Sequence, residues 1–369
     1  MKKITVIGIG KIGLCNALCF ENSGYDVIGY DIDQKYVNSI NNKTYKSFEP
    51  KVNELLNKSS NFIATTDINI AVKHSKILFI IINTPYDDNL GYSHNNLNNF
   101  ISQINSLELE NYEIIISSSI RPGYFKNELP KITNKLVKCN FSYSPQFVRQ
   151  GDIINTFIKP HLIIIGVNNN NSKNILKNIY ENILVNKPYL DFMSIESAEI
   201  CKFANASLVT MKISFTNFIS AIADSTPNAD KNEIMNSLGH DKRIGNGSLL
   251  PGWGYGGPCF PRDNKILINY AESLNIPSNI LKETHNYNEF YAYFKANMFL
   301  NNNDNDNKII IDEVSYRPNC PIPMIENSHK LKVAKLLVKN GKKVIIKDNK
   351  FVIEKVKEEF SDLFDYEII

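Results

Sequence analysis

The sequence lacks the features of several specialised protein classes. Its 369 residues carry a formal net charge of only +3, which argues against a nucleic-acid-binding or membrane-surface protein. The six cysteines are scattered without CxxC spacing, so we expect reduced thiols, a cytoplasmic location and no metal site. No signal peptide and no apolar run of membrane-spanning length is visible. These absences favour a soluble globular protein of two or three domains.

The N-terminal segment 3–31 has the order strand, glycine-rich turn, helix, strand. Its turn has the form Gly-x-Gly-x-x-Gly, with glycines at Gly8, Gly10 and Gly13. In such a turn the first glycine permits a tight bend, the second admits a pyrophosphate to the helix N-terminus, and the third allows close helix–strand packing. Asp31, at the end of the second strand, would accept a ribose 2′-OH and repel a 2′-phosphate. The pattern predicts NAD binding; the alternative is a glycine-rich turn without a ligand.

Three segments with continuous apolar runs follow, at residues 77–82, 113–116 (after Glu113) and 161–165 (after His161). Such runs, separated by helical segments, are typical of strands buried on both faces of a parallel sheet. We therefore predict an N-terminal Rossmann-type doubly wound sheet, whose site lies at the carboxyl ends of its strands. Residues just after the first two runs, and so candidates for that site or merely for ordinary loop ends, are Thr84, Pro85 and Ser119.

One long helix is predicted over residues 195–223. Its apolar residues step by three and four, which is the spacing of a helical stripe. A helix of this length spans about 40 Å, too long to bury on one small domain. We expect it to connect domains and to pack against a second subunit. Lys202 and Asn205 are three residues apart beside the stripe, although a lysine in this position is commonly a solvated surface residue.

A glycine-rich segment precedes a cysteine and an aspartate. Gly252, Gly254, Gly256 and Gly257 are followed by Cys259 and Asp263. Glycines let a backbone bend sharply and approach a ligand closely, and a nucleophilic thiol needs such a platform with a titrating partner nearby. The alternative is a surface loop whose cysteine packs as a small hydrophobe.

The remaining patterns suggest three domains. We read the polar tract 301–307 as a linker, and 308–311 and 343–346 as strands around a helix at 328–340. The expected domains are a Rossmann domain over 1–190, a central helical domain over 191–300, and a short α/β unit over 308–369.

Together these residues resemble the UDP-glucose/GDP-mannose dehydrogenase family from residue 1 to about 290. The segments 243–246 and 252–263 are similar to its catalytic-cysteine signature, 197–205 to its lysine–asparagine helix, and 144–151 to a substrate loop. The resemblance implies oxidation of a nucleotide sugar's primary alcohol to a carboxylate with two NAD and one water, and UDP-glucose is the expected substrate. The short C-terminal unit is expected to help bind the nucleotide sugar, and the long helix to form a homodimer.

The resemblance also implies roles for individual residues. Lys202 and Asp263 would remove the hydroxyl proton, Cys259 would trap the aldehyde covalently, and Lys202 with Asn205 would stabilise oxyanions. The implied catalytic set is Cys259, Lys202, Asp263, Asn205, Ser119 and Gln146. The implied cofactor contacts are Gly8, Gly10, Ile12, Gly13, Asp31, Tyr36, Thr84, Pro85 and Ser119. Lys35 lies next to Tyr36. The implied substrate contacts are Gln146, Phe147, Val148, Arg149, Lys202, Asn205, Tyr255, Gly256, Gly257, Arg317 and, across a subunit boundary, Arg243.

The sequence departs from the family pattern at several positions. Gln146 and Gln150 stand where the family has glutamate, Ser119 where it has threonine, and Asn205 lies third rather than fourth after Lys202. Glutamine orients a water but does not take its proton, so hydrolysis of the thioester would be slow or would depend on Asp263. The alternatives are another nucleotide sugar (a UDP-N-acetylhexosamine or GDP-mannose), a two-electron β-hydroxyacid dehydrogenase, or a binder without turnover.

Overall fold

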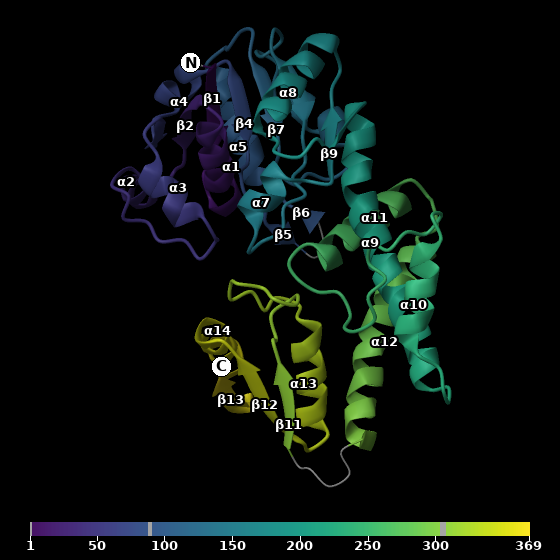
Figure 1. The fold of residues 1–369 in the computed structure, drawn as a ribbon. Coiled ribbons are helices and arrows are strands. Elements are labelled where there is room, and N and C mark those ends of the chain that lie inside the picture. The colour runs from purple at the N-terminus through teal and green to yellow at the C-terminus, as the bar shows by residue number, and fades with distance from the viewer. Residues whose placement is uncertain (1, 88–90, 303–307) are drawn as a thin grey trace. The chain divides into compact units, whose positions relative to one another are not determined.

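The computed structural model describes residues 2–87, 91–302 and 308–369 (Figure 1). The chain groups into two compact units, Met1–Lys202 and Phe203–Ile369, and each is described by itself. The three domains expected from the sequence stay a prediction. The expected linker falls mainly on 303–307, outside the described residues, while the helix before it continues to Asn302.

Within the described residues of the first unit, eight strands form one sheet in the order β10-β9-β8-β7-β4-β1-β2-β3. The pairings are parallel, except that β8 and β9 meet through one antiparallel pair, Tyr143 with Gly166. The doubly wound sheet is thus confirmed, although β9 is not the parallel neighbour of β8 that its apolar run suggested. The strands are β1 Lys2–Ile7, β2 Tyr25–Tyr30, β3 Phe62–Thr65, β4 Ile77–Ile80, β7 Glu113–Ile116, β8 Asn140–Tyr143, β9 Leu162–Gly166 and β10 Tyr189–Met193; a small hairpin pairs β5 Tyr86–Asp87 with β6 Gly91–Tyr92.

Helices cover both faces of this sheet because neighbouring strand residues point to opposite faces. Val6 packs in one core with residues of α1, α3, α7 and α8, and the adjacent Ile7 packs in another with residues of α4 and α5. Both cores consist mainly of Ile, Leu, Val and Phe, as the apolar runs predict. The helices are α1 Lys11–Asn22, α2 Gln34–Asn41, α3 Val52–Lys58, α4 Ile68–His74, α5 Asn95–Ser106, α6 Tyr124–Asn127, α7 Ile153–Ile158 and α8 Asn170–Ile183, with a 3-10 turn η1 at Leu129–Ile132.

The long helix α9 spans Ile195–Asp224, so the predicted helix is confirmed. By length and mean hydropathy (1.3 over 18 residues) it would also qualify as a membrane span, contrary to our expectation that no segment does. Its buried positions, however, include Thr210, Asn217 and Ser220, which make hydrogen bonds. Buried, bonded polar side chains of this kind are typical of a core helix in a globular protein.

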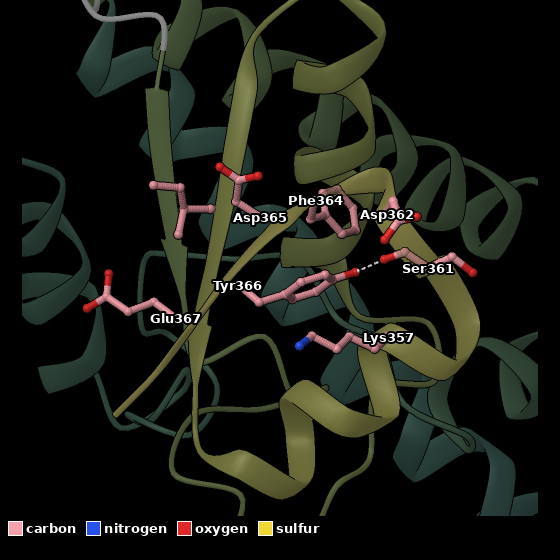
Figure 2. Close-up of a pocket in the computed structure, with 8 residues that line it drawn as sticks. Lys357, Ser361, Asp362, Phe364, Asp365, Tyr366 and Glu367 are labelled. Atoms are coloured by element: carbon pink, nitrogen blue, oxygen red, sulfur yellow. Dashed lines mark hydrogen bonds between the residues drawn. The ribbon is translucent and has the colours of Figure 1, made fainter.

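The second unit joins helices to a small sheet. The helices α10 Lys231–His240, α11 Phe260–Ser273 and α12 Asn279–Asn302 are followed by a parallel sheet β11-β12-β13. Its predicted strands and helix are confirmed as β11 Lys308–Asp312, β12 Lys343–Asp348 and α13 His329–Lys339; α14 Lys350–Phe360, a 3-10 turn η2 at Ser361–Leu363, and β13 Asp365–Ile368 complete it. A surface depression of about 770 Å³ lies beside β13, where the Tyr366 hydroxyl donates to the Ser361 carbonyl (Figure 2). The residues proposed for the site do not line it.

Candidate active site

The glycine turn between β1 and α1 leaves open space at Gly10. A Cβ on Gly8 (φ +84°) would lie 2.7 Å from the Ile81 carbonyl oxygen, and one on Gly13 would lie 1.9 Å from the Gly8 oxygen. Protein packing therefore explains these two glycines. A Cβ on Gly10 would meet nothing within 4 Å, and the first turn of α1 has no side-chain cap. Open space at an uncapped helix N-terminus fits the pyrophosphate of a dinucleotide.

Asp31 and position 36 have different surroundings. Asp31 follows β2 and is half-buried, and its carboxylate accepts a hydrogen bond from the Asp33 amide at 3.2 Å. A carboxylate has further lone pairs for a ribose hydroxyl. Tyr36, in contrast, donates its hydroxyl to the Ile9 carbonyl at 2.7 Å. Tyr36 thus supports the glycine turn from the protein side, and Lys35 is exposed; a cofactor contact at position 36 stays a prediction.

The segments after β4 and β7 lie side by side because these strands are parallel neighbours. Thr84 is buried, Pro85 is exposed, and Ser119 is half-buried. The Ser118 hydroxyl donates to the Ile82 carbonyl at 2.8 Å and so ties the two segments together. The structure therefore brings these candidates to one edge of the sheet, as the topology rule predicts.

The loop 144–151 follows β8 and is held by residues that the sequence analysis did not identify. The buried carboxylate of Glu49 accepts the Gly151 amide hydrogen at 2.7 Å. Lys11, in the first turn of α1, donates to the Gln150 side chain at 3.1 Å. Gln146, Phe147 and Val148 are half-buried and Arg149 is exposed. Only the fold places Glu49 near this loop, so no local sequence signal could have found it.

Lys202 is not a solvated surface residue, since it is only 9% exposed. Its Nζ lies 5.3 Å from the centre of the Phe147 ring, a favourable cation–π distance. The structure thus brings together two predicted site residues from α9 and the loop after β8. Asn205 is exposed, whereas Ala206, one residue later, is buried. Asn205 and Lys202 therefore differ in exposure, and the proposed role of Asn205 stays a prediction.

In the second unit, Cys259 is exposed and immediately precedes α11. The Asp263 amide donates to the Cys259 carbonyl at 2.8 Å, and the Asp263 side chain, one turn along the helix, is 1% exposed. A helix N-terminus stabilises an anion, and thiols in such positions are typical of reactive cysteines. The alternative of a buried, inert cysteine is wrong for Cys259.

The glycines before Cys259 have a different explanation from the expected one. A Cβ on Gly254 would lie 2.2 Å from the His329 ring, one on Gly256 would lie 2.1 Å from the Asn327 carbonyl oxygen, and one on Gly257 would lie 2.5 Å from the Tyr316 ring. These glycines are required because the C-terminal segments 316 and 327–329 pack directly on the loop. A substrate contact by Gly256 and Gly257 stays a prediction.

Buried polar side chains fix the remainder of the loop. Tyr255 is 5% exposed, and its hydroxyl lies 3.2 Å from His285 Nδ1 and 3.4 Å from Asn264 Nδ2. Asn264 also bonds Thr210 on α9, at 2.9 Å. Burial raises the pKa of Tyr255, so the phenol stays protonated at neutral pH. Asn264 and His285 were not predicted; their helical positions alone carry no signal of this network.

The two predicted arginines lie at the surface or close to it. Arg243 has an 89% exposed side chain that pairs with Asp241 at 2.6 Å. Arg317 Nε donates to the Tyr316 hydroxyl at 3.2 Å. Burial is the main cause that raises the pKa of Tyr316, and the nearby Cys259 side chain is among the lesser causes. The proposed sugar contacts of both arginines stay predictions.

The fold and the open turn at Gly10 define a dinucleotide-binding protein of the doubly wound class. Residues 2–184 match the model of the UDP-glucose/GDP-mannose dehydrogenase family NAD binding domain, and residues 196–290 match that of its central domain. The chain belongs to this family, and NAD is the cofactor of its first unit.

Curated relatives of this chain include two UDP-glucose 6-dehydrogenases. A UDP-glucose 6-dehydrogenase of Rhizobium meliloti is 28% identical over 76% of this chain and 66% of its own length, and one of Bacillus subtilis is 29% identical over 78% and 63%. The chain thus spans less than two thirds of these relatives. A UDP-glucose dehydrogenase from Pyrobaculum islandicum has the same fold, with a TM-score of 0.88 at 23% identity over 100% of this chain and 86% of that one. A UDP-D-ManNAc dehydrogenase from Pyrococcus horikoshii gives 0.79 at 23% over 94% and 83%.

Proposed function

We propose that this protein is a cytoplasmic, NAD-dependent nucleotide-sugar 6-dehydrogenase and that its substrate is UDP-glucose. The observation that carries the proposal is the exposed Cys259 at the start of α11 with the buried Asp263 one turn later. The NAD-binding first unit and the family membership support it. Curated relatives named as UDP-glucose 6-dehydrogenases favour that sugar. The cytoplasmic location follows from the need for a reduced thiol.

The proposed reaction oxidises the sugar C6 alcohol to a carboxylate. When bound at the Gly10 turn, NAD would supply the hydride acceptor for each of the two oxidations. Lys202 and Asp263, through a held water, take the hydroxyl proton as the first hydride leaves. The Cys259 thiolate then adds to the aldehyde carbon, and loss of the second hydride converts this thiohemiacetal to a thioester. Water cleaves the C–S bond, which releases the uronate and restores the thiol.

The proposed catalytic residues differ in how well their surroundings suit their roles. Lys202, desolvated against Phe147, is suited to stabilise the oxyanions. Asn205 is exposed and is the weaker candidate for that task. Gln146 orients water without accepting its proton, which leaves Asp263 as the base for thioester hydrolysis. A nucleotide-sugar binder without turnover is the second candidate, and Gln146 is the observation that favours it.

We propose a homodimer formed through an exposed apolar face on α9 and α12. Phe215 and Phe218 are 52% and 44% exposed, and Phe290 is 54% exposed. Phe218 contacts Tyr287, which contacts Phe290, so the aromatic face is continuous across both helices. Exposed apolar patches of this kind mark interfaces. We expect Phe218→Glu to give monomers by sedimentation at micromolar protein, while Phe48→Glu, at a 61% exposed site in the first unit, leaves dimers. A monomeric parent protein would refute the dimer.

The decisive experiment measures NADH and acid formed from a limiting nucleotide sugar. We expect two NADH per UDP-glucose; one would indicate a two-electron dehydrogenase, and none with any sugar would indicate a binder. Assaying UDP-N-acetylhexosamines and GDP-mannose alongside identifies the substrate. Cys259→Ser should abolish acid formation and retain NAD binding, whereas Cys139→Ser, whose half-buried thiol lies in the first unit, should retain activity. Undiminished acid formation by Cys259→Ser would refute the assignment.

A further inference from the structure

Glu199 is a buried carboxylate that the proposed reaction does not use. It lies on α9, one turn before Lys202, and is 1% exposed. Its two oxygens accept hydrogen bonds from the backbone amides of Gly123, at 2.7 Å, and Phe125, at 3.0 Å. Burial raises the pKa of Glu199, and these amide bonds lower it. Both oxygens thus accept from the backbone at the N-terminus of α6 (Tyr124–Asn127), so the carboxylate is directed at this helix start and not at a substrate.

Gly123, one of these two amides, ends the loop that follows β7 and carries Ser119. A second acid holds its other side: Arg121 donates to Glu128 at 3.0 Å, and His94 Nδ1 lies 2.9 Å from the same carboxylate. The Arg121 amide donates to His94 Nε2 at 3.1 Å, so the ring proton is on Nδ1 and is donated to Glu128. Burial lowers the pKa of His94, which favours this neutral ring. Glu128 and Glu199 therefore restrain the loop at two points, Arg121 and Gly123.

The beginning of α9 is fixed against the sheet by a different contact. A Cβ on Gly166, at the end of β9, would lie 2.7 Å from Ile195 Cα and 3.0 Å from Ala198 Cβ. The helix backbone therefore packs directly on the strand end. This contact sets where α9 begins, and Glu199 adds a hydrogen-bonded link from the same helix to the Ser119 loop.

We propose that Glu199 is a positioning residue that couples Lys202 to the Ser119 loop. The Glu199 side chain, through its hydrogen bonds to the Gly123 and Phe125 amides, fixes the position of the α9 turn that carries Lys202 relative to the loop after β7. The effect on turnover rests on the proposed function. The coupling of Lys202 to the Ser119 loop does not, because both lie in the first unit. A displacement of about 1 Å at a catalytic group costs about 100-fold in rate, so the coupling matters for the chemical step more than for cofactor affinity.

The first test compares Glu199→Gln with Glu196→Gln, an exposed glutamate in the first turn of the same helix. Each assay is run well below the variant's own Tm. We expect Glu199→Gln to lower kcat about 10- to 100-fold with the KM and the dissociation constant of NAD changed less than about 3-fold, because the Gly10 turn is untouched. Glu196→Gln should behave like the parent. A folded Glu199→Gln protein with parental kcat would overturn the proposal.

A second test does not depend on turnover. Trinitrobenzenesulfonate labelling of Lys202 and amide exchange at residues 123–125 are followed by peptide mass spectrometry. We expect Glu199→Gln to increase both rates at least about 3-fold, as for loss of a buried restraint, and Glu196→Gln to change neither. Unchanged Lys202 labelling would refute the coupling. If the parent protein oxidises no nucleotide sugar, the proposed function fails while this labelling result still decides the role of Glu199.

Discussion

The side-chain amide of Asn288 pairs with both backbone polar groups of Tyr255. The Tyr255 N–H donates to Asn288 Oδ1 at 2.8 Å, and Asn288 Nδ2 donates to the Tyr255 carbonyl at 3.1 Å. Asn288 lies on α12 and is 4% exposed. Asn288 therefore satisfies the backbone N–H and C=O of Tyr255 in the way that a neighbouring strand would. Tyr255 lies four residues before Cys259.

Replacement of Asn288 tests this pairing. Asn288→Ala leaves a buried N–H and a buried carbonyl without a partner, so we expect a loss of about 2–4 kcal/mol in the free energy of unfolding. Denaturant titration measures it. Asn286→Ala, at an exposed site on the same helix, is the control and should cost less than about 0.5 kcal/mol. Equal effects of the two substitutions would contradict a specific role for Asn288.

The glycines before Cys259 provide a steric test. Gly256→Ala would place a Cβ 2.1 Å from the Asn327 carbonyl oxygen, whereas at Gly252 a Cβ meets nothing within 4 Å. We expect Gly256→Ala to destabilise the protein by about 1–3 kcal/mol and Gly252→Ala to be neutral, as judged by thermal unfolding. If both variants melt like the parent, the close packing of Asn327 on this loop is not present in solution.

Acid should destabilise the protein through His329. Its Nε2 lies 3.2 Å from the Asn288 carbonyl, and burial lowers its pKa from 6.5 to about 4. A lowered folded-state pKa means that the stability is present above pH 6.5 and is lost as the pH falls towards 4. The loss is about 3 kcal/mol. Denaturant unfolding between pH 4 and 7 measures the free energy of unfolding, and His329→Gln should make it depend less on pH. An equally steep pH dependence in His329→Gln would show that other groups cause the loss.

Gln146 is expected to limit thioester hydrolysis. Gln146→Glu supplies a group that accepts a proton from water, so breakdown of the Cys259 thioester should become faster, by about 10-fold or more. Rapid-quench measurement of the deacylation step tests this. Gln103→Glu, at an exposed position of α5, is the matched control. The same or slower deacylation in Gln146→Glu would refute the limiting role of Gln146.

Much of the fold could be predicted because its signals are local. Apolar runs of strand length identify β4 and β7, and stepping by three and four identifies α9. The turn from Gly8 to Gly13 followed by Asp31 predicts the dinucleotide site, since its spacing is dictated by one βαβ unit. The exposure of Cys259 at a helix start also agrees with its predicted role.

Other features depended on residues far apart in the chain. Asn327 donates to the Gly257 carbonyl across 70 residues, and that contact, with its neighbours, explains the glycines that the sequence suggested were for a ligand. Glu199 and Glu49 bond loops that lie more than 70 residues away. The amino-acid sequence by itself determined the sheet, the long helix and the position of an exposed thiol at a helix start, because periodicity and side-chain type act locally. Only the tertiary structure decided which buried acids and amides hold the site loops, because hydrogen-bond partners and close packing are set by how distant segments meet.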